Sequence, residues 1–353
     1  MFSPREYLYN LVTGKIKGPV AVFLRLCLFV LSLTYGLAVI ILAAFYKIKP
    51  VRLGAKVISV GNITLGGTGK TTFVEYLSRL LSLQGKKVAV LSRGYRRNTA
   101  KQGTQGIGDE PAMLQQKLPY LQVIVDKNRI KAGFKAIRDY AVDTLILDDG
   151  MQQWRIFKDL EIVTIEAANP FGNYRMLPAG FLREPQSALR RADIFVLTQV
   201  RPNQDTSDLT SRLERINANA LIIESIHQPD GFSSVSNPGE LLGVDALKGK
   251  SVLIFSGIGN PQGFENCIGE LGIKIVKSFR FSDHHNYTQE DIDNIIKTTR
   301  QMNVDTIITT QKDAVKVKEL QVKVVSILAL NIKLNITKNE AEFNRRLLSL
   351  YSL

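Results

Sequence analysis

The chain has 353 residues, of which 45% are hydrophobic and 22% charged, so it can bury full cores and is neither disordered nor coiled-coil. Two cysteines allow at most one disulfide, and no Cys/His cluster is spaced for zinc, which is typical of a protein in a reducing compartment. The net charge of +14 predicts an anionic partner, either nucleic acid, an anionic membrane or a phosphorylated substrate.

The first predicted element is an apolar helix near the N-terminus. Residues 26–46 carry no charge, whereas Arg25 and Lys47 flank them. At about 1.5 Å per residue the helix is roughly as long as a bilayer's hydrocarbon core is thick. A buried core helix is the alternative, but helices of soluble proteins usually show a polar stripe and this one shows almost none. We therefore predict a membrane anchor over residues 1–49. Basic residues on both flanks favour a helix lying in one leaflet, with a single span as the alternative.

A phosphate-binding loop follows the anchor. Lys56–Val60 is a predicted strand and Lys70–Leu83 a predicted helix, and GNITLGGTGKTT connects them. In this arrangement backbone N–H groups of the loop close on phosphates, Lys70 supplies charge and the Thr71 hydroxyl can bind Mg²⁺. The first glycine of the usual pattern is replaced by Thr64. The predicted nucleotide contacts are Thr64, Leu65, Gly66, Gly67, Thr68, Gly69, Lys70, Thr71 and Thr72.

A pair of carboxylates provides the second half of a nucleotide site. A predicted strand over residues 142–147 runs into Asp148, Asp149 and Gly150. Carboxylates at strand ends beside a phosphate loop typically hold Mg²⁺, directly or through water. A polar turn after a core strand is the alternative interpretation. We predict that Asp148, Asp149 and Thr71 are the metal ligands.

Three rival classes share some of these features. The loop resembles that of partitioning-type ATPases that work on membranes, but their signature lysine is replaced by Leu65. A GTPase is disfavoured because the string Thr310–Asp313 departs from the base-specificity motif. No nucleic-acid partner is predicted, since the densest basic cluster flanks an apolar helix. The membrane-recruited ATPase is the runner-up.

Several short strings in order resemble one family, the tetraacyldisaccharide 4′-kinases (lipid A 4′-kinases) of Gram-negative inner membranes. They are VGNITLGGTGKT, SRGYRR (92–97), GDEP (108–111), LDDGMQQ (147–153), LPAGFLREP (177–185), FSGIGNP (255–261) and FSDHH (281–285). The resemblance implies phosphorylation of the 4′-hydroxyl of a tetraacyl glucosamine disaccharide 1-phosphate, with ATP and Mg²⁺ as cofactors. It also implies a location on the cytoplasmic face of the bacterial inner membrane, with a lipid A precursor and the membrane surface as partners. No protein partner is predicted.

The chain departs from the family pattern at two positions. Gln153 stands where the family usually has a histidine, so any contact made by that imidazole is changed or lost. Arg96 stands where a glycine is common. Neither position carries the chemistry that we expect.

The resemblance implies that Asp109 is the catalytic base and that His284 supports it, with Lys70 as the third catalytic residue. Phosphoryl transfer to a hydroxyl needs a group that accepts the proton. From its local sequence alone, Asp109 is also a good helix N-cap because Pro111 follows in the first turn. The DHH string is otherwise a polar loop before a helix that starts near Thr288, where Thr288 and Asp291 can form a capping arrangement.

Further substrate contacts are predicted near strand and loop ends. Arg93 and Tyr95 follow the second predicted strand, where Tyr95 is either a phosphate contact or an edge aromatic. Glu110, Arg183 and Glu184 are further candidates, of which Arg183 and Glu184 are expected where the two lobes meet, as substrate or interlobe contacts. Arg183, Arg190 and Arg191 form either a basic group for a lipid phosphate or a solvated helix face.

The alternation of short strands and amphipathic helices predicts an α/β protein with a parallel sheet. We expect a P-loop NTPase-like kinase lobe over residues 50–190 and a smaller α/β lobe over 191–353. Its strands are expected near 194–198, 221–225, 251–255, 273–279, 306–309 and 322–327. Asp109 would then come from the first lobe and His284 from the second, so catalysis would require the lobes to close.

Overall fold

The computed structural model describes residues 4–94, 108–201, 203–237, 239–283, 285–317, 320 and 326–352. The chain divides into two compact units. Unit 1 contains Met1–Arg93, Leu121–Ile226 and Ile336–Leu353, and unit 2 contains Gly94–Tyr120 and His227–Asn335.

The unit boundaries differ from the lobes expected in chain order. Two long strands, β7 (Leu221–Ser234) and β12 (Ser326–Lys338), each run from one unit into the other. β6 (Ile194–Thr198), which we expected in the second lobe, belongs to unit 1. α4 (Asp109–Lys117), which we expected in the first lobe, belongs to unit 2. The periodicity of a strand shows that it is a strand, but it does not show which core each half joins.

Unit 1 is built on a parallel sheet, and the expected α/β fold is confirmed. Its strand order is β7-β6-β5-β1-β4-β2-β3, and all of the described pairs are parallel. The remaining strands are β1 (Lys56–Gly61), β2 (Val88–Ser92), β3 (Gln122–Val125), β4 (Thr144–Asp148) and β5 (Leu160–Glu166). The central strands are buried on both faces, which explains their continuous apolar runs.

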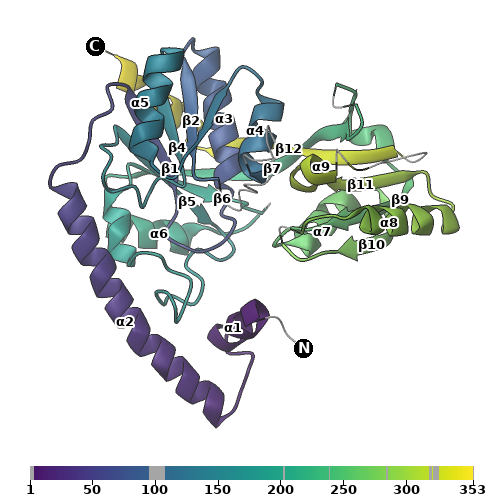
Figure 1. Cartoon of the computed structure of the whole chain (residues 1–353), viewed down its shortest axis with the longest axis horizontal. Coiled ribbons are helices and arrows are strands. Elements are labelled where there is room, and N and C mark those ends of the chain that lie inside the picture. The colour runs from purple at the N-terminus through teal and green to yellow at the C-terminus, as the bar shows by residue number, and fades with distance from the viewer. Residues whose placement is uncertain are drawn as a thin grey trace. The chain divides into compact units, whose positions relative to one another are not determined.

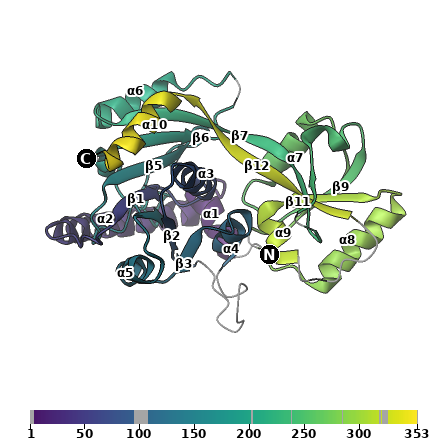
Figure 2. The ribbon, with the colours of Figure 1, turned by 90° about the horizontal axis from the view of Figure 1, so that it is seen from above.

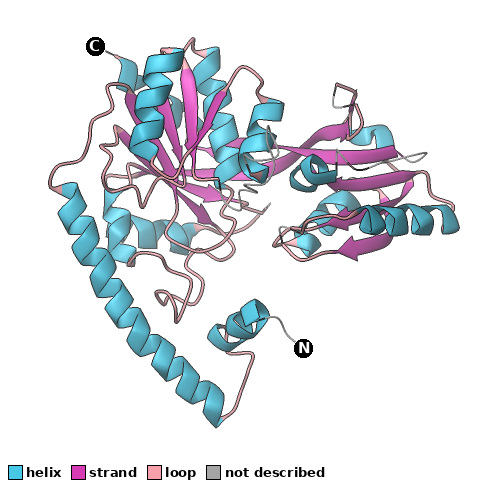
Figure 3. Cartoon of the chain, in the orientation of Figure 1, coloured by secondary structure: helices cyan, strands magenta, loops and turns pink. Residues whose placement is uncertain are grey.

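Helices cover both faces of this sheet. The expected helix over Lys70–Leu83 is present with those bounds as α3, and α5 (Arg129–Tyr140) lies on the opposite face (Figure 2). The C-terminal helix α10 (Glu340–Leu348) returns to unit 1, where Phe343 packs against Phe73 of α3 at 5.9 Å between ring centres. After the first strand, unit 1 also contains the helices η2 (Gln186–Arg191), α6 (Ser207–Ile216) and η4 (Ser349–Tyr351). Between β5 and η2 the chain forms a long loop, pink in Figure 3.

Two N-terminal helices, α1 (Pro4–Val12) and α2 (Pro19–Lys47), precede the sheet (Figure 1). The most apolar window of α2 has a mean hydropathy of 2.5, and only 22% of it is buried. α2 is therefore long and apolar enough to cross a membrane, and its exposure argues against a core helix. One side of α2 contacts the long loop, since Tyr35 Oη donates a hydrogen bond to the Arg183 carbonyl at 3.1 Å.

Unit 2 has its own parallel strands in the order β10-β9-β11-β12, with β8 (Leu241–Leu242) antiparallel to β7. These are β9 (Ser251–Ser256), β10 (Lys274–Arg280) and β11 (Thr306–Thr310), close to the expected ranges. β12 is described from Ser326, and residues 321–325, which include most of the strand expected over 322–327, lie outside the described residues. The helices of unit 2 are α4, α7 (Pro261–Glu270), α8 (Gln289–Gln301), α9 (Gln311–Val317) and η3 (Val244–Leu247). The predicted Thr288–Asp291 cap of α8 is confirmed as a capping box.

Candidate active site

The phosphate loop of unit 1 occupies residues 62–69, between β1 and α3. Gly69 is the N-cap of α3 with a φ of 73°, and Gly66 has a φ of 133°, so both positions need glycine. An added Cβ on Gly66 or Gly67 would meet nothing within 4 Å. The loop therefore has open space beside backbone N–H groups and the N-terminus of α3, as a phosphate site requires.

Thr64, which replaces the usual first glycine, is buried and is not among the residues with positive φ. Asn62 Nδ2 donates to the Thr64 carbonyl at 2.9 Å and to its hydroxyl at 3.2 Å. A threonine is accommodated here because its backbone is ordinary and its hydroxyl has a partner. Farther along the loop, the Thr68 hydroxyl lies 2.8 Å from that of Thr164 on β5.

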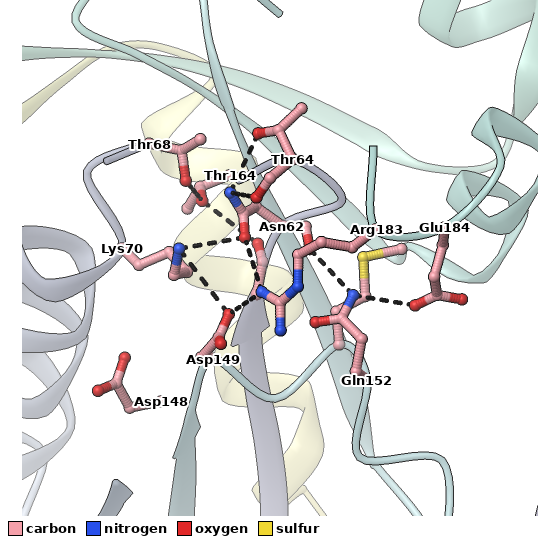
Figure 4. A network of polar contacts seen from close by, with 12 residues as sticks. Asn62, Thr64, Thr68, Lys70, Asp148, Asp149, Gln152, Thr164, Arg183 and Glu184 are labelled. Carbon is pink, nitrogen blue, oxygen red and sulfur yellow. Dashed lines mark hydrogen bonds and ion pairs between the residues drawn. The ribbon is translucent and has the colours of Figure 1, made fainter. Parts of the chain in front are cut away.

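Lys70 belongs to a compact charged cluster (Figure 4). Its Nζ donates to Asn62 Oδ1 at 3.1 Å and lies 3.8 Å from Asp149 Oδ1. Arg183 donates to the same carboxylate oxygen at 2.7 Å. Burial acts to raise the pKa of Asp149, but the charges of Lys70 and Arg183 outweigh it and hold that pKa below its usual value. Two cations thus share one carboxylate beside the phosphate loop.

The two strand-end aspartates have different surroundings. The parallel register of β1 and β4 places Val60 opposite Asp148, so the loop and the acids start at the same sheet edge. Asp148 is buried, and Ser92 Oγ donates to its carboxylate at 3.1 Å. Asp149 has a φ of 56° and is partly exposed, with its side chain turned to the Lys70 cluster.

Close packing holds the aspartate turn against the end of β1. An added Cβ on Gly150 would lie 2.5 Å from Ser59 Oγ, and one on Gly61 would lie 2.5 Å from the Met151 backbone nitrogen. Only glycine permits this approach at either position. The LDDGM string thus positions the aspartates by backbone contact with the strand that carries the phosphate loop.

A buried polar network supports the site from the long loop. Gln152 Nε2 donates to the Asn62 carbonyl at 3.1 Å and to Glu184 at 3.0 Å. Arg191 pairs with both oxygens of Glu184, each at 2.9 Å, and Glu184 is only 1% exposed. Glu184, which we expected to contact substrate or to lie between lobes, is here an internal positioning group of unit 1.

The donor set fits a magnesium ion. Among the described residues no group of three His, Cys, Asp or Glu side chains could hold a metal by itself. Mg²⁺ usually binds one or two carboxylates together with substrate phosphates and water. The Asp148 and Asp149 carboxylates and the Thr71 hydroxyl, near the start of α3, supply that hard oxygen chemistry.

The other predicted residues are placed as follows. Asp109 and Glu110 lie in the first turn of α4, and this part of the chain belongs to unit 2, so our assignment of Asp109 to the first lobe was wrong. The N-cap of α4 is Gly108, so Asp109 is not the capping residue. Arg93 is exposed after β2. The side chain of Asp109, and Tyr95 and His284 altogether, lie outside the described residues.

Asn62, Gln152 and Arg129 also belong to the site, although their roles were not predicted from the sequence. Arg129 is 2% exposed, and its Nη2 donates to the Asp148 carbonyl at 3.4 Å. Burial lowers the pKa of this guanidinium, and the nearby charges of Asp148 and Asp149 oppose that effect. The available signal for Asn62 was its position between a strand and a glycine-rich loop, where a polar residue follows five largely apolar ones.

The fold of unit 1 and its loop define a P-loop nucleotide-binding protein. The chain matches the family model of tetraacyldisaccharide-1-P 4′-kinase over residues 24–352. It is 35% identical over 347 residues to the tetraacyldisaccharide 4′-kinase of Halothermothrix orenii, covering 90% of this chain and 89% of that protein. The corresponding enzyme of Syntrophus aciditrophicus is 35% identical, with 91% of each chain covered.

A solved structure shows the same fold. LpxK from Aquifex aeolicus in complex with ATP is 29% identical, with a TM-score of 0.75, and the match covers 93% of this chain and 100% of that one. The chain therefore belongs to the tetraacyldisaccharide-1-P 4′-kinase family, and the resemblance seen in its motifs is confirmed. Family membership does not favour the alternative of a partitioning-type ATPase.

Proposed function

We propose that this chain is an ATP-dependent kinase that phosphorylates the 4′-hydroxyl of a tetraacyl disaccharide 1-phosphate, a step of lipid A biosynthesis. The observation that carries the proposal is the open phosphate loop of a family member, with Lys70, Asp149 and Arg183 gathered beside it. Transfer to a hydroxyl is mainly a matter of placing the reactants and neutralising charge, and this cluster supplies both.

Within unit 1, each charged group has a distinct task. Lys70 neutralises charge on the transferred phosphoryl group, and Asn62 holds its ammonium in place at 3.1 Å. Arg183 adds a second positive charge at the same carboxylate, and its position is maintained by a backbone bond from its N–H to the Ile63 carbonyl. Asp149 keeps both cations oriented while nucleotide is absent, and its lowered pKa keeps it ionised.

Thr71, Asp148 and Asp149 would hold Mg²⁺. When bound, this ion neutralises phosphate charge and fixes the orientation of the phosphates. Asp149 would bind the ion more readily than Asp148, by releasing its contacts with Lys70 and Arg183. Asp148 is buried and accepts a hydrogen bond from Ser92.

For the acceptor hydroxyl, we retain the dyad implied by the family motifs. Asp109 accepts the hydroxyl proton and His284 supports it. Both residues belong to unit 2 by chain position, so the dyad does not join two lobes as first expected. Glu110, Arg93 and Tyr95 remain candidate substrate contacts.

We place the protein on the cytoplasmic face of the bacterial inner membrane, attached by α2. Its outward side chains are large and apolar, and one side packs on the loop that carries Arg183. These contacts favour a helix that lies in one leaflet rather than a span. Deletion of residues 1–46 should release the protein from salt-washed membranes, and retention after deletion would show that another surface carries the attachment.

The decisive experiment incubates the purified protein with ATP labelled on its γ-phosphate and a tetraacyl disaccharide 1-phosphate in detergent micelles. The expected product is a labelled bisphosphorylated lipid whose formation requires Mg²⁺. ATP hydrolysis that proceeds equally without the lipid acceptor, with no labelled lipid, would favour the ATPase alternative. A reaction with the acceptor already phosphorylated at the 4′ position serves as the control.

A further inference from the structure

Unit 1 has a basic pocket whose lining includes none of the residues proposed above for the kinase reaction. It has a volume of about 430 Å³ and lies between η2 and α6. Its lining residues are Gln186, Ser187, Arg190, Arg212, Arg215 and Ile216. Three guanidinium groups thus share one pocket, and none of the described residues that line it is acidic. Like charges gathered in this way attract an anion.

One arginine of the pocket is held in position. Arg212 Nη2 donates to Gln186 Oε1 at 2.8 Å. Its guanidinium carbon lies 5.2 Å from the centre of the Phe171 ring and 4.8 Å from that of Tyr174. With the described residues Arg212 makes no further side-chain hydrogen bond, so its other N–H groups can meet a ligand. A planar guanidinium fixed by stacking is suited to recognising a phosphate through two parallel hydrogen bonds.

The pocket adjoins the apolar helix α2. Tyr174, which contacts Arg212, also lines a groove of about 410 Å³ between α2 and the long loop. In that groove the Arg175 guanidinium carbon lies 5.6 Å from the centre of the Phe29 ring of α2. At the C-terminal end of α2, burial and then the nearby charge of Arg191 lower the pKa of Lys47. Through Tyr174, the pocket that contains Arg212 therefore adjoins the groove beside the element expected to enter the bilayer.

We propose that Arg190, Arg212 and Arg215 bind the phosphate headgroup of an anionic membrane phospholipid. The proposal rests on the membrane attachment of α2 proposed above. Charge complementarity and continuity with the groove beside α2 favour a lipid of the bilayer over a soluble anion, because α2 lying in the leaflet would bring anionic headgroups to this side of unit 1. The site makes attachment depend on lipid charge, whereas α2 alone supplies attachment to any bilayer.

The test uses flotation of the full-length protein with two kinds of vesicle, without ATP or acceptor lipid. One kind is pure phosphatidylcholine and the other also contains phosphatidylglycerol. In the variant Arg190→Gln/Arg212→Gln/Arg215→Gln, affinity for the anionic vesicles should fall by about tenfold or more, with affinity for the neutral vesicles unchanged. Thermal melting checks that the variant is folded, and a variant with three lysines should recover part of the preference.

A matched control removes the same charge elsewhere on unit 1. The variant Arg79→Gln/Lys135→Gln/Arg138→Gln changes three exposed side chains of α3 and α5. It should keep the preference for anionic vesicles, since diffuse charge is screened by salt whereas a pocket acts at short range. An equal loss in this control would overturn the proposal, because attraction would then follow net charge alone.

Three other outcomes would also contradict the headgroup site. Wild-type protein that shows no preference for anionic vesicles has no such site. Release from anionic vesicles by inorganic phosphate, but not by chloride at equal ionic strength, would assign the pocket to a soluble anion. A raised KM for the acceptor in neutral micelles, with unchanged vesicle binding, would assign it to the phosphate of the substrate. Failure of the wild type to bind neutral vesicles would instead contradict the anchor role of α2, so the two proposals fail separately.

Discussion

The carboxyl ends of the parallel strands are built differently in the two units. In unit 1 the strand ends open into a glycine-rich loop in which Leu65 is 52% exposed and Gly67 has free space around it. In unit 2 the fully buried Asp313 closes the corresponding edge, accepting hydrogen bonds from the Gly257 N–H at 2.9 Å and the Thr310 hydroxyl at 2.7 Å.

This difference shows why two similar sheets do not make two nucleotide sites. A phosphate site needs backbone N–H groups that are left for a ligand. In unit 2 the carboxylate of Asp313 already occupies one such N–H, and an added Cβ on Gly257 would lie 3.0 Å from Tyr287 Oη. The Thr310–Asp313 string, which departs from the base-specificity motif of GTPases, instead links the ends of β9 and β11 through the hydrogen bonds of Asp313.

The largest effect should come from the open edge of unit 1. Lys70→Ala should lower kcat by roughly 10²–10³-fold, because the lysine neutralises charge in the transition state. Thermal stability should be nearly unchanged. Lys56→Ala, at the opposite end of β1, is a matched control that removes only an exposed ion pair with Asp159. A folded Lys70→Ala enzyme with near-normal turnover would contradict the phosphate site.

A second prediction concerns the Asp109–His284 dyad, the catalytic contribution that we propose for unit 2. Asp109→Ala and His284→Ala should each lower kcat by about 10²-fold or more with little change in ATP affinity. The double variant should be scarcely worse than the poorer single one, because the two groups act as one. His285→Ala is the control, since His285 pairs with Asp291 at 3.0 Å near the cap of α8. Multiplied effects would contradict the dyad.

A substitution at the closed edge of unit 2 should lower the stability of the protein and leave nucleotide binding unchanged. Asp313→Ala leaves the Gly257 N–H without a partner, so the free energy of unfolding should fall by about 2–4 kcal/mol. ATP affinity of the folded protein should be kept, since the phosphate loop lies in unit 1. Urea unfolding measures the free energy of unfolding, and equilibrium binding measures the ATP affinity. Asp230→Ala, which breaks an exposed pair with Lys333, should cost less than about 1 kcal/mol.

A smaller effect is expected from His227 in unit 2. Burial, and then the charge of Lys117, lowers its pKa to about 4. The unfolded chain binds the proton more readily, so the stabilising contribution of the neutral ring is complete above the ordinary pKa and is lost as the pH falls towards 4. Between about pH 7 and about pH 5 this loss should be roughly 1–2 kcal/mol. The variant His227→Gln should lose less stability over the same interval, and identical pH profiles would contradict the assignment.

The smallest effect should come from the contact between α2 and the long loop. Tyr35→Phe removes the hydrogen bond to the Arg183 carbonyl, worth about 0.5–1.5 kcal/mol, and should lower kcat by no more than a few-fold. Tyr46→Phe is the control, because its ring keeps the contact with Arg155. A loss as large as that of Lys70→Ala would show that α2 positions Arg183 far more strongly than one hydrogen bond allows.

The candidate site shows how far local sequence reaches. Gly66, Gly69 and Lys70 were identified because a strand, a loop and a helix start follow one another within a few residues, and each has its own signal. Asn62, Gln152 and Glu184 share a network whose members are far apart in the chain. No local pattern distinguishes Glu184, which is 1% exposed and paired with Arg191, from a carboxylate that contacts substrate.

The sequence by itself determined the α/β class, the apolar helix, the phosphate loop and the family, because periodicity, glycine spacing and short motifs are local properties. Only the tertiary structure decided that β7 and β12 pass between units, that α4 with Asp109 belongs to unit 2, and that α10 returns to pack on α3. These outcomes depend on which apolar faces bury one another, and packing between distant segments leaves no short-range signature in the chain.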